Sequence, residues 1–516
     1  MDEAVRLAPA WREPYLLRAK LLAKANRQRE AVEDLERARS IDGEWRSDVA
    51  AEWLVVHAHM ADWREREELL AWFESAGTDG RVAIPALHML ATFGAADLQR
   101  SVLEKVAQRE YLPAAASEVL AASRGGPERI KSRVRVGYLS PDFRSHAVMI
   151  VLGDVFAHHE RSGFEWYAYS LVTAPQDPVQ QRVMASFDHF ADVSGWSDEA
   201  IVDRIRRDGI DVLVDLAGHT EGARLGVLRR RAAPVQVTYI GFPGTTGMAE
   251  VDYLFGSPVV APKGSETWFT ERLVRLPWLA PVLPRTVSDR VWTRAEAGLP
   301  QEAVVFCSFN NTYKITPEMF DIWMSILRQV DGSVLWLYAK APEVEVNLRR
   351  EAQARGVDPA RLYFAAAVDM PNYLARMRLA DLFLDTHPYN AHTTALDAVW
   401  VGLPVLTFEG GSFVSRMAAG VLSSIGLREL VAADVTDYEA RAVALGRDPA
   451  RLAGLRQRLL SPEMRTSPPF DAARFARYLE AAYRAMHERA VAGLPPAPME
   501  VSVDGQVTVL QSPAVT

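Results

Sequence analysis

The chain has 516 residues, and at roughly 100–200 residues per domain it has room for about three domains. Hydrophobic residues make up 49% and charged residues 24%, an ordinary balance for a soluble globular protein. The net charge of −8 argues against a general nucleic-acid binder, and no run approaches the ~20 apolar residues of a membrane helix. The N-terminus lacks the pattern of a secretory signal, so we expect a cytoplasmic protein. The single cysteine, Cys307, excludes an internal disulfide.

The N-terminal quarter is rich in Ala, Leu, Arg and Glu, which predicts an all-helical segment over residues 1–125. Two stretches within it match each other, and their members Leu7 and Ile41 stand 34 positions apart, the period of a tetratricopeptide repeat. Because one repeat cannot bury its apolar face alone, either the helices up to Leu120 cap it or the repeat ends a longer array. A plain helical bundle is the alternative.

After a linker signal at Ser123–Pro127, strands alternate with helices in the pattern of parallel sheets. A polar, proline-containing stretch at residues 281–300 separates two such sets. We therefore predict an α/β fold with two Rossmann-like lobes, over residues 133–290 and 300–493. Ligands of such sheets bind beyond the carboxyl ends of the strands. Residues 494–516 are rich in Pro and Val without periodicity, so we expect a disordered tail.

The segment Asp385–Asp397 follows an apolar strand and opens a helix at His392, Thr393 and Thr394. The first turn of a helix has free N–H groups and a partial positive charge that attract phosphate, and hydroxyl side chains add donors. Asp397 lies one turn further on, where a carboxylate can hold ribose hydroxyls. The segment predicts a nucleotide-diphosphate site. A loop with a threonine N-cap is the alternative.

Other candidate residues also stand at strand ends. Lys314 follows a strand and precedes a helix, where its ammonium can offset the charge on a leaving phosphate; a solvated surface lysine is the alternative. His146 and His219 are candidates for a base, an acceptor-orienting group or a sugar contact, or have no task. The glycine-rich turn Gly241–Gly247 is neither a P-loop nor a dinucleotide fingerprint; its N–H groups are candidates for facing a ligand, and plain turn chemistry is the alternative. No spacing of His, Asp and Glu resembles a metal site.

Five stretches, in this order, resemble the catalytic region of the O-GlcNAc transferase / SPINDLY family, which covers residues from about 133 to 480 here. The stretches are Arg135–Phe143, Asp215–Thr220, Pro234–Gly247, Phe309–Ile315 and Asp385–Thr394. The resemblance implies a GT-B glycosyltransferase that moves a sugar from a nucleotide donor to protein Ser or Thr, with inversion and without a metal or other cofactor. It implies protein or peptide acceptors, and no nucleic-acid or membrane partner.

The resemblance also implies roles for single residues. Lys314 would contact the diphosphate, and His146 would line the sugar and acceptor side. The base would stack on Tyr373, and Arg376 in the same stretch is a further donor-binding candidate. The family leaves the catalytic base open. The remaining donor-binding candidates are Asn311, His392, Thr393, Thr394 and Asp397, and the remaining sugar- or acceptor-side candidates are His219, Gly244 and Thr245.

The chain departs from the family pattern at three places. Animal members have His where Tyr373 stands, and their long insertion between the lobes is missing here. Asn390–Thr394 follows the O-GlcNAc transferase form, whereas Asp215–Thr220 is closer to SPINDLY, and we favour UDP-GlcNAc over GDP-fucose as the donor. The alternatives are a transferase for UDP-glucose or GDP-fucose, a transferase that acts on Asn, a nucleotide-sugar epimerase, and a repeat scaffold with an inactive catalytic region.

Overall fold

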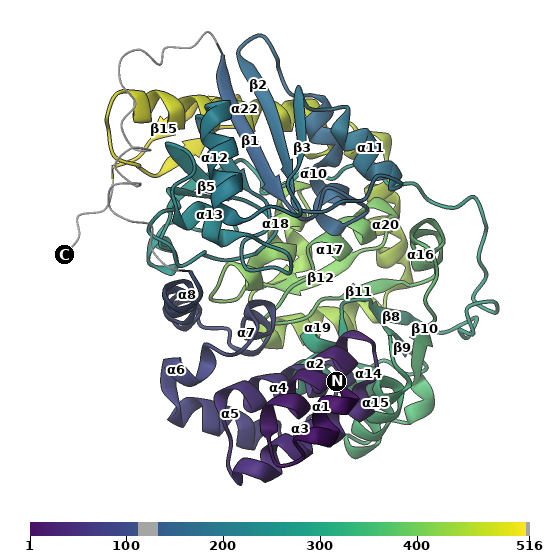
Figure 1. Ribbon diagram of the computed structural model, residues 1–516. Helices are drawn as coiled ribbons and strands as arrows, with labels where there is room; N and C mark the ends of the chain where they lie inside the picture. The colour runs from purple at the N-terminus through teal and green to yellow at the C-terminus, as the bar shows by residue number, and fades with distance from the viewer. Residues whose placement is uncertain (112–132, 512–516) are drawn as a thin grey trace. The chain divides into compact units, whose positions relative to one another are not determined.

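The computed structural model describes residues 1–111 and 133–511, which divide into two compact units (Figure 1). The six-stranded unit consists of Met1–Val102, Thr286–Gly410 and Glu429–Leu460, and the nine-stranded unit of Leu103–Arg285, Gly411–Arg428 and Ser461–Thr516. The predicted linker at Ser123–Pro127 and the predicted end of the helical segment lie outside the described residues.

The N-terminal part is all-helical, as predicted. Tyr15, Ala19 and Ala31 are buried where α2 packs on α3, and the two small alanine side chains let the helix backbones approach closely. Gly43 ends α3 in the left-handed region at φ 73°, which glycine adopts at no steric cost. The helices are α1 (Asp2–Leu7), α2 (Arg12–Lys24), α3 (Gln28–Asp42), α4 (Ser47–Met60), α5 (Arg66–Ser75), α6 (Gly77–Arg81), α7 (Ala86–Thr92) and α8 (Ala96–Glu110).

These helices belong to the same unit as the six-stranded sheet, up to Val102. Asn347 Nδ2 donates a hydrogen bond of 3.0 Å to the carbonyl of Met60, and Arg66 pairs with Glu318 at 2.8 Å. The helical segment, which the sequence suggested as a domain of its own, therefore packs directly on the helices of the second predicted lobe.

The six-stranded sheet is parallel throughout, in the order β10-β9-β8-β11-β12-β13. Some of its helices begin at side-chain caps; Thr316, for example, accepts the Met319 N–H before α14, whose first turn holds Pro317. The elements are β8 (Val305–Ser308), η3 (Thr312–Lys314), α14 (Pro317–Gln329), β9 (Val334–Tyr338), α15 (Pro342–Ala354), η4 (Pro359–Arg361), β10 (Leu362–Ala365), α16 (Met370–Met377), β11 (Leu382–Leu384), α17 (Thr393–Trp400), β12 (Val405–Phe408), β13 (Val431–Ala432), α19 (Val435–Gly446) and α20 (Pro449–Leu460).

The nine-stranded sheet has the order β15-β14-β7-β6-β5-β4-β1-β2-β3, and only β15 runs antiparallel to its neighbour. The elements are β1 (Val134–Ser140), α10 (Ala147–Ala157), β2 (Phe164–Ser170), α11 (Pro178–Met184), β3 (His189–Asp192), α12 (Asp198–Asp208), β4 (Val212–Asp215), α13 (Leu225–Arg229), β5 (Val235–Thr238), β6 (Tyr253–Gly256), η2 (Glu266–Trp268), β7 (Arg272–Arg275), η5 (Val414–Arg416), α18 (Met417–Ser424), η6 (Arg428–Leu430), α21 (Pro462–Arg465), η7 (Pro468–Phe470), α22 (Ala472–Val491), β14 (Met499–Val501) and β15 (Val507–Val509).

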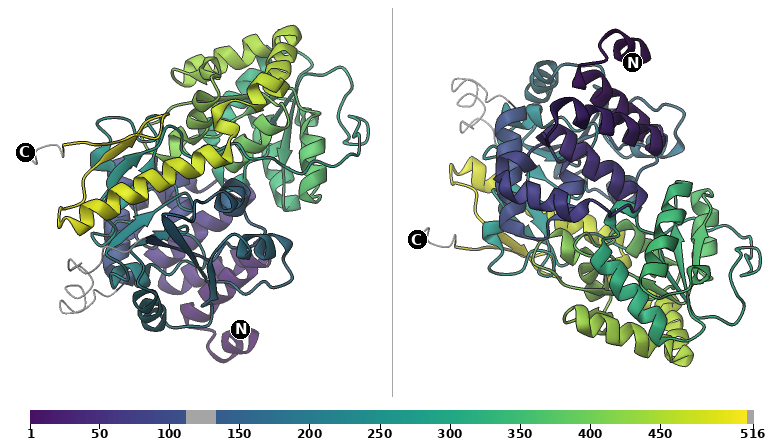
Figure 2. Two further views of the ribbon diagram at one scale, coloured as in Figure 1. Left: turned by 90° about the horizontal axis from the view of Figure 1, so that it is seen from above. Right: turned by 90° about the horizontal axis from the view of Figure 1, so that it is seen from below.

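Two expectations about the C-terminal region are corrected. The long helix α22 belongs to the nine-stranded unit, not to the second lobe, and runs along its sheet against β1, β4 and β5 (Figure 2). Within the described residues the tail is ordered, because β14 joins the edge strand β7 and then pairs with β15; residues 512–516 of the predicted tail lie outside the described residues. Met499 and Val501 alternate into the core at 0% and 4% exposure.

Candidate functional site

Lys314 and the loop before α17 lie together at one edge of the six-stranded sheet. β8 and β11 are parallel neighbours, so the chain leaves both at the same carboxyl edge. Lys314 Nζ donates to the Asn390 carbonyl at 3.4 Å and lies 3.8 Å from the centroid of the Tyr389 ring. The structure thus brings together two segments that the sequence analysis had placed at separate strand ends.

The Lys314 ammonium is half-buried rather than solvated like a typical surface lysine. Burial lowers the pKa of Lys314 to about 8, although the nearby Asp385 carboxylate acts in the opposite direction. At neutral pH the side chain is still mostly protonated. Lys314 is therefore a cation at the carboxyl end of the sheet. A bound anion would stabilise the ammonium and replace the hydration that it loses on burial.

Asp385, which ends β11, organises the loop that Lys314 contacts. Its buried carboxylate accepts the N–H groups of Thr386 at 2.8 Å and Ala391 at 2.7 Å, and the Thr407 hydroxyl at 2.8 Å. Burial raises the pKa of Asp385 to about 6, because these hydrogen bonds only partly replace lost hydration. The sequence analysis gave Asp385 no role. The sequence did hold a signal for such a role, because Asp385 is an acidic residue directly after an apolar strand.

A second layer of hydrogen bonds fixes the same loop from β8. Asn310 Nδ2 donates to the Thr386 hydroxyl at 2.9 Å, and that hydroxyl donates to the Tyr389 carbonyl at 2.6 Å. Asn390 Nδ2 donates to the Thr386 carbonyl at 2.7 Å. The loop is therefore rigidly built before any ligand binds, which favours a binding site over a mobile connection.

The predicted phosphate-binding residues His392, Thr393 and Thr394 stand at the start of α17, and all three are half-buried. His392 is the N-cap residue, but its side chain makes no cap hydrogen bond to the first turn. The His392 side chain therefore does not occupy the first-turn N–H groups, and these groups can donate hydrogen bonds to an anion. Asp397, one turn on, is 3% exposed.

The predicted base-stacking residue Tyr373 lies on α16, which contacts α17. Its half-buried ring meets Phe309 edge-on at 5.9 Å between centroids, and burial together with the Asp397 carboxylate raises the pKa of its hydroxyl. Tyr373 and Asp397 are therefore electrostatic neighbours, as a shared nucleoside site requires. Asn311 is exposed just before η3.

Arg376 has a different environment from the one expected of a donor contact. Its guanidinium is 7% exposed, donates to the Ala366 carbonyl at 2.5 Å, and lies 5.8 Å and 5.7 Å from the ring centroids of Trp292 and Trp336. Ser288 N also donates to the Pro371 carbonyl at 3.0 Å. Arg376 thus secures the segment of Trp292 onto α16, and its donor contact stays a prediction.

His146 caps α10 in the nine-stranded unit. Its Nδ1 accepts the Val148 N–H at 3.3 Å and lies 3.3 Å from an Asp142 carboxyl oxygen, so a ligand contact would use Nε2. Burial lowers the pKa of His146 and raises the pKa of Asp142 to about 6. The imidazole is therefore neutral at physiological pH. Because Nδ1 accepts the Val148 N–H, Nε2 carries the hydrogen and can donate a hydrogen bond to a ligand.

His219 sits beyond β4 and lies against the glycine-rich turn. Its Nε2 is 2.8 Å from the Thr246 carbonyl, so that nitrogen must carry the proton. The ring meets Phe242 edge-on at 5.3 Å, and burial lowers the pKa of His219 to about 4. The neutral ring therefore leaves Nδ1 as its acceptor atom.

Thr245 has a structural environment, and its predicted contact on the sugar or acceptor side stays a prediction. It is 2% exposed, and its hydroxyl donates to Glu271 at 2.6 Å. The same buried carboxylate accepts the Thr246 N–H at 2.7 Å and the Thr246 hydroxyl. Gly244 is also buried, and a Cβ there would come within 3.1 Å of the Phe242 ring. The turn is thus held from behind by Glu271, a residue that the sequence analysis did not find.

Replacing Glu271 by Ala should lower the free energy of unfolding by about 2–4 kcal/mol, because it leaves two buried hydroxyls and one N–H without their acceptor. Glu271→Gln keeps the size and one acceptor oxygen and should cost less than half as much. Chemical denaturation followed by circular dichroism measures both. Equal stability of Glu271→Ala and the unchanged protein would contradict this role.

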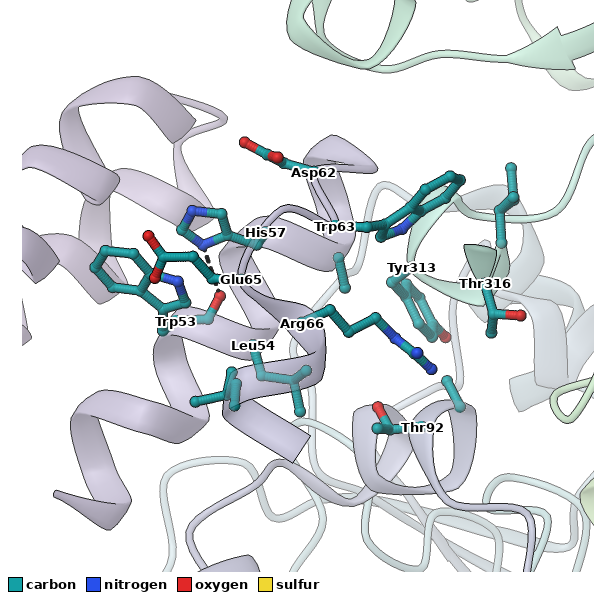
Figure 3. Close-up of a pocket in the computed structure, with 14 residues that line it drawn as sticks. Trp53, Leu54, His57, Asp62, Trp63, Glu65, Arg66, Thr92, Tyr313 and Thr316 are labelled. Atoms are coloured by element: carbon teal, nitrogen blue, oxygen red, sulfur yellow. Dashed lines mark hydrogen bonds between the residues drawn. The ribbon is translucent and has the colours of Figure 1, made fainter. Parts of the chain in front are cut away.

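A small pocket forms where the helical segment meets the loop after β8 (Figure 3). Trp53, Leu54 and Arg66 line it from the helices, and Tyr313 and Thr316 from the loop. Its volume of about 40 Å³ is far below that of a ligand site, typically about 300–1,000 Å³. The pocket is a small gap where the N-terminal helices pack on the residues next to Lys314, and it is too small to be the donor site.

Residues 1–111 and 133–511 contain neither a cluster of metal-binding side chains nor a membrane-spanning helix. No three or more His, Cys, Asp or Glu side chains gather there as a metal site would need, and the metal-independent reaction stays a prediction. None of the helices in these ranges combines the length and apolarity that a membrane crossing requires.

Comparison with known proteins places these features in a family. A solved structure of the Thermobaculum terrenum O-GlcNAc transferase, a lysine-to-methionine mutant, matches with a TM-score of 0.81 and 30% identity, covering 95% of this chain and 93% of that chain. This likeness confirms the predicted fold class.

Two curated plant proteins also match. The Arabidopsis thaliana "Probable UDP-N-acetylglucosamine--peptide N-acetylglucosaminyltransferase SEC" is 34% identical over 362 residues, 68% of this chain and 37% of that protein. The Solanum lycopersicum "Probable UDP-N-acetylglucosamine--peptide N-acetylglucosaminyltransferase SPINDLY" is 32% identical over 362 residues, 69% of this chain and 39% of that protein. The chain thus spans less than two fifths of either relative. The model of Glycosyl transferase family 41 matches residues 122–279 and 284–479, well over half of the chain, which therefore belongs to glycosyl transferase family 41.

Proposed function

We propose that this chain is an inverting, metal-independent glycosyltransferase that moves GlcNAc from UDP-GlcNAc to Ser or Thr hydroxyls of proteins. The observation that carries the proposal is the meeting of the Lys314 ammonium with the Asn390–Thr394 loop at one sheet edge. The names of the plant relatives support the donor and the peptide acceptor.

In this proposal the six-stranded unit holds the donor. The base stacks on Tyr373, the ribose hydroxyls reach Asp397, and the diphosphate lies at the N-terminus of α17 beside Lys314. The acceptor oxygen attacks the anomeric carbon while the bond from that carbon to the β-phosphate oxygen breaks. UDP leaves with the bonding electron pair, and Lys314 with the first-turn N–H groups offsets the new charge.

The nine-stranded unit carries the residues proposed for the sugar and acceptor side. His146 and His219 are both neutral at physiological pH, so either can orient a hydroxyl without adding positive charge. The acceptor hydroxyl must lose its proton as the new bond forms. We assign no residue to that step, because neither histidine has a geometric claim over the other.

Incubation with labelled UDP-GlcNAc and a cell lysate tests the proposed activity, and we expect labelled protein together with release of UDP. A parallel panel of UDP-glucose and GDP-fucose tests the donor choice. Free sugar product without any protein acceptor would favour an epimerase. Absence of nucleotide binding by calorimetry would favour an inactive scaffold and overturn the proposal.

The value of kcat/KM for the donor should fall as the pH rises through about 8, because Lys314 acts in its protonated form. The Lys314 pKa is lowered from its usual value, so the active form is complete below pH 7 and is lost above about pH 8. Initial rates at low donor concentration between pH 6 and 9.5 measure this limb. In Lys314→Arg, whose guanidinium does not titrate in this range, the limb should disappear from whatever activity is left.

A further inference from the structure

Four aromatic side chains, Tyr389, Tyr313, His59 and His88, form a column of ring contacts that begins at the Lys314 ammonium. The ammonium lies over the face of Tyr389, 3.8 Å from the ring centroid. Tyr389 in turn meets the Tyr313 ring edge-on at 6.1 Å, with an interplanar angle of 79°. An ammonium over an aromatic face is attracted by the ring quadrupole, and the attraction grows when water is excluded. Its one described hydrogen bond, to Asn390, is long at 3.4 Å, so the ring is a major part of its surroundings.

The column continues into the N-terminal helices. Tyr313 contacts His59 of α4 at 5.2 Å and His88 of α7 at 4.7 Å between ring centroids. The two histidines join through their Nε2 atoms at 3.0 Å. A Cβ on Gly94 would meet Pro388 at 3.3 Å, so the helical segment also packs against the loop that carries Tyr389. Figure 3 shows Tyr313 at this seam, among side chains from the helices.

The electrostatics of the column suit a neighbouring cation. Burial lowers the pKa of His59 to about 4 and that of His88 to about 3, so both rings are neutral and add no repulsion. In a neutral pair one Nε2 donates and the other accepts. Burial keeps the Tyr389 and Tyr313 hydroxyls protonated, since the pKa of each is raised. Asp385 is the charged group that acts on Lys314 from the loop.

We propose that Tyr389 is a positioning residue that holds the Lys314 ammonium toward the donor phosphates, and that the His59–His88 pair supports it through Tyr313. The N-terminal helices are then part of the donor site in addition to any role in acceptor binding. The catalytic importance of this contact between Tyr389 and Lys314 rests on the proposed function. The contact itself is present in the protein without a ligand.

The pKa of Lys314 is the readout. If Tyr389 only filled space, changing the electron density of its ring without changing its shape would leave that pKa unchanged. Competitive acetylation followed by peptide mass spectrometry gives that pKa without any activity, and the seven lysines of the chain make the Lys314 peptide easy to follow. Tyr389→Phe is compared with 3,4,5-trifluorophenylalanine at the same position, which keeps the shape and weakens the quadrupole. Fluorination should lower the Lys314 pKa by about half a unit.

A second pair of variants tests the helical support. His88→Leu breaks the column and should change the Lys314 pKa, whereas Leu35→Ala, a fully buried change in α3, should lower stability without changing it. Equal Lys314 pKa values in the Phe and trifluorophenylalanine proteins would overturn the positioning role of Tyr389, and an unchanged value in His88→Leu would overturn the support. If these shifts appear but no sugar is transferred from any donor, the inference stands and the proposed function fails.

Discussion

Replacing Lys314 by Met should lower kcat/KM for UDP-GlcNAc by about 10²–10³-fold, the usual cost of removing one group that stabilises developing charge. Methionine has a similar length but no charge, so the departing diphosphate would keep only the N–H groups of α17. The effect should appear in kcat as well as in UDP affinity, because the negative charge on the β-phosphate grows in the transition state.

The same change should not weaken the fold. Burial lowers the pKa of Lys314, which means that the folded protein holds this charge at a cost, and a neutral side chain removes that cost. Lys340→Met, an exposed lysine in the same unit, is the matched control and should keep kcat/KM within about twofold. Steady-state kinetics with thermal melts of both variants measure the two effects. Full activity in Lys314→Met would remove the lysine from the mechanism.

Replacing Asp385 by Asn should change how stability depends on pH. The pKa of Asp385 is raised from 3.8 to about 6, so the folded state binds its proton more tightly than the unfolded state does. Its contribution is therefore complete below about pH 4 and is lost as the pH rises through about 6. An asparagine can still accept the Thr386 and Ala391 N–H groups without ionising.

Between pH 4 and pH 8 the Asn variant should gain about 3 kcal/mol in free energy of unfolding relative to the unchanged protein, the equivalent of a shift of about two pKa units. Urea denaturation of both proteins at several pH values measures the gap. Asp331→Asn, an exposed aspartate in the same unit, should show no such trend. A gap that stays constant, or that changes in the opposite direction, would show that Asp385 is not a buried carboxylate of raised pKa.

Much of this architecture could be predicted from the sequence. Alternating apolar strands and amphipathic helices define the two α/β sets, and residues at strand ends, such as Lys314 and Asp385, are brought to a common edge by any parallel sheet. The order of strands was not predictable, because period and composition do not say that β8 and β11 are neighbours. That adjacency is what places Lys314 against Asn390.

The missed features depend on long-range contacts. The helix α22 packs on the nine-stranded sheet, and its own sequence does not reveal this partner, because contacts such as that of Tyr138 with Tyr483 at 3.1 Å join positions hundreds of residues apart. Glu271 reads as an ordinary surface residue until it meets the threonines of the glycine-rich turn. The strands β14 and β15 are only three residues each, too short for a periodic signal.

The position of the diphosphate tests the account most directly. A crystal structure of the protein with UDP should place Lys314 Nζ within about 3 Å of a diphosphate oxygen, and the same diphosphate should accept N–H groups from the first turn of α17. A UDP molecule bound elsewhere, or a diphosphate at α17 with the Lys314 ammonium directed away from it, would contradict the shared role of this lysine and this helix.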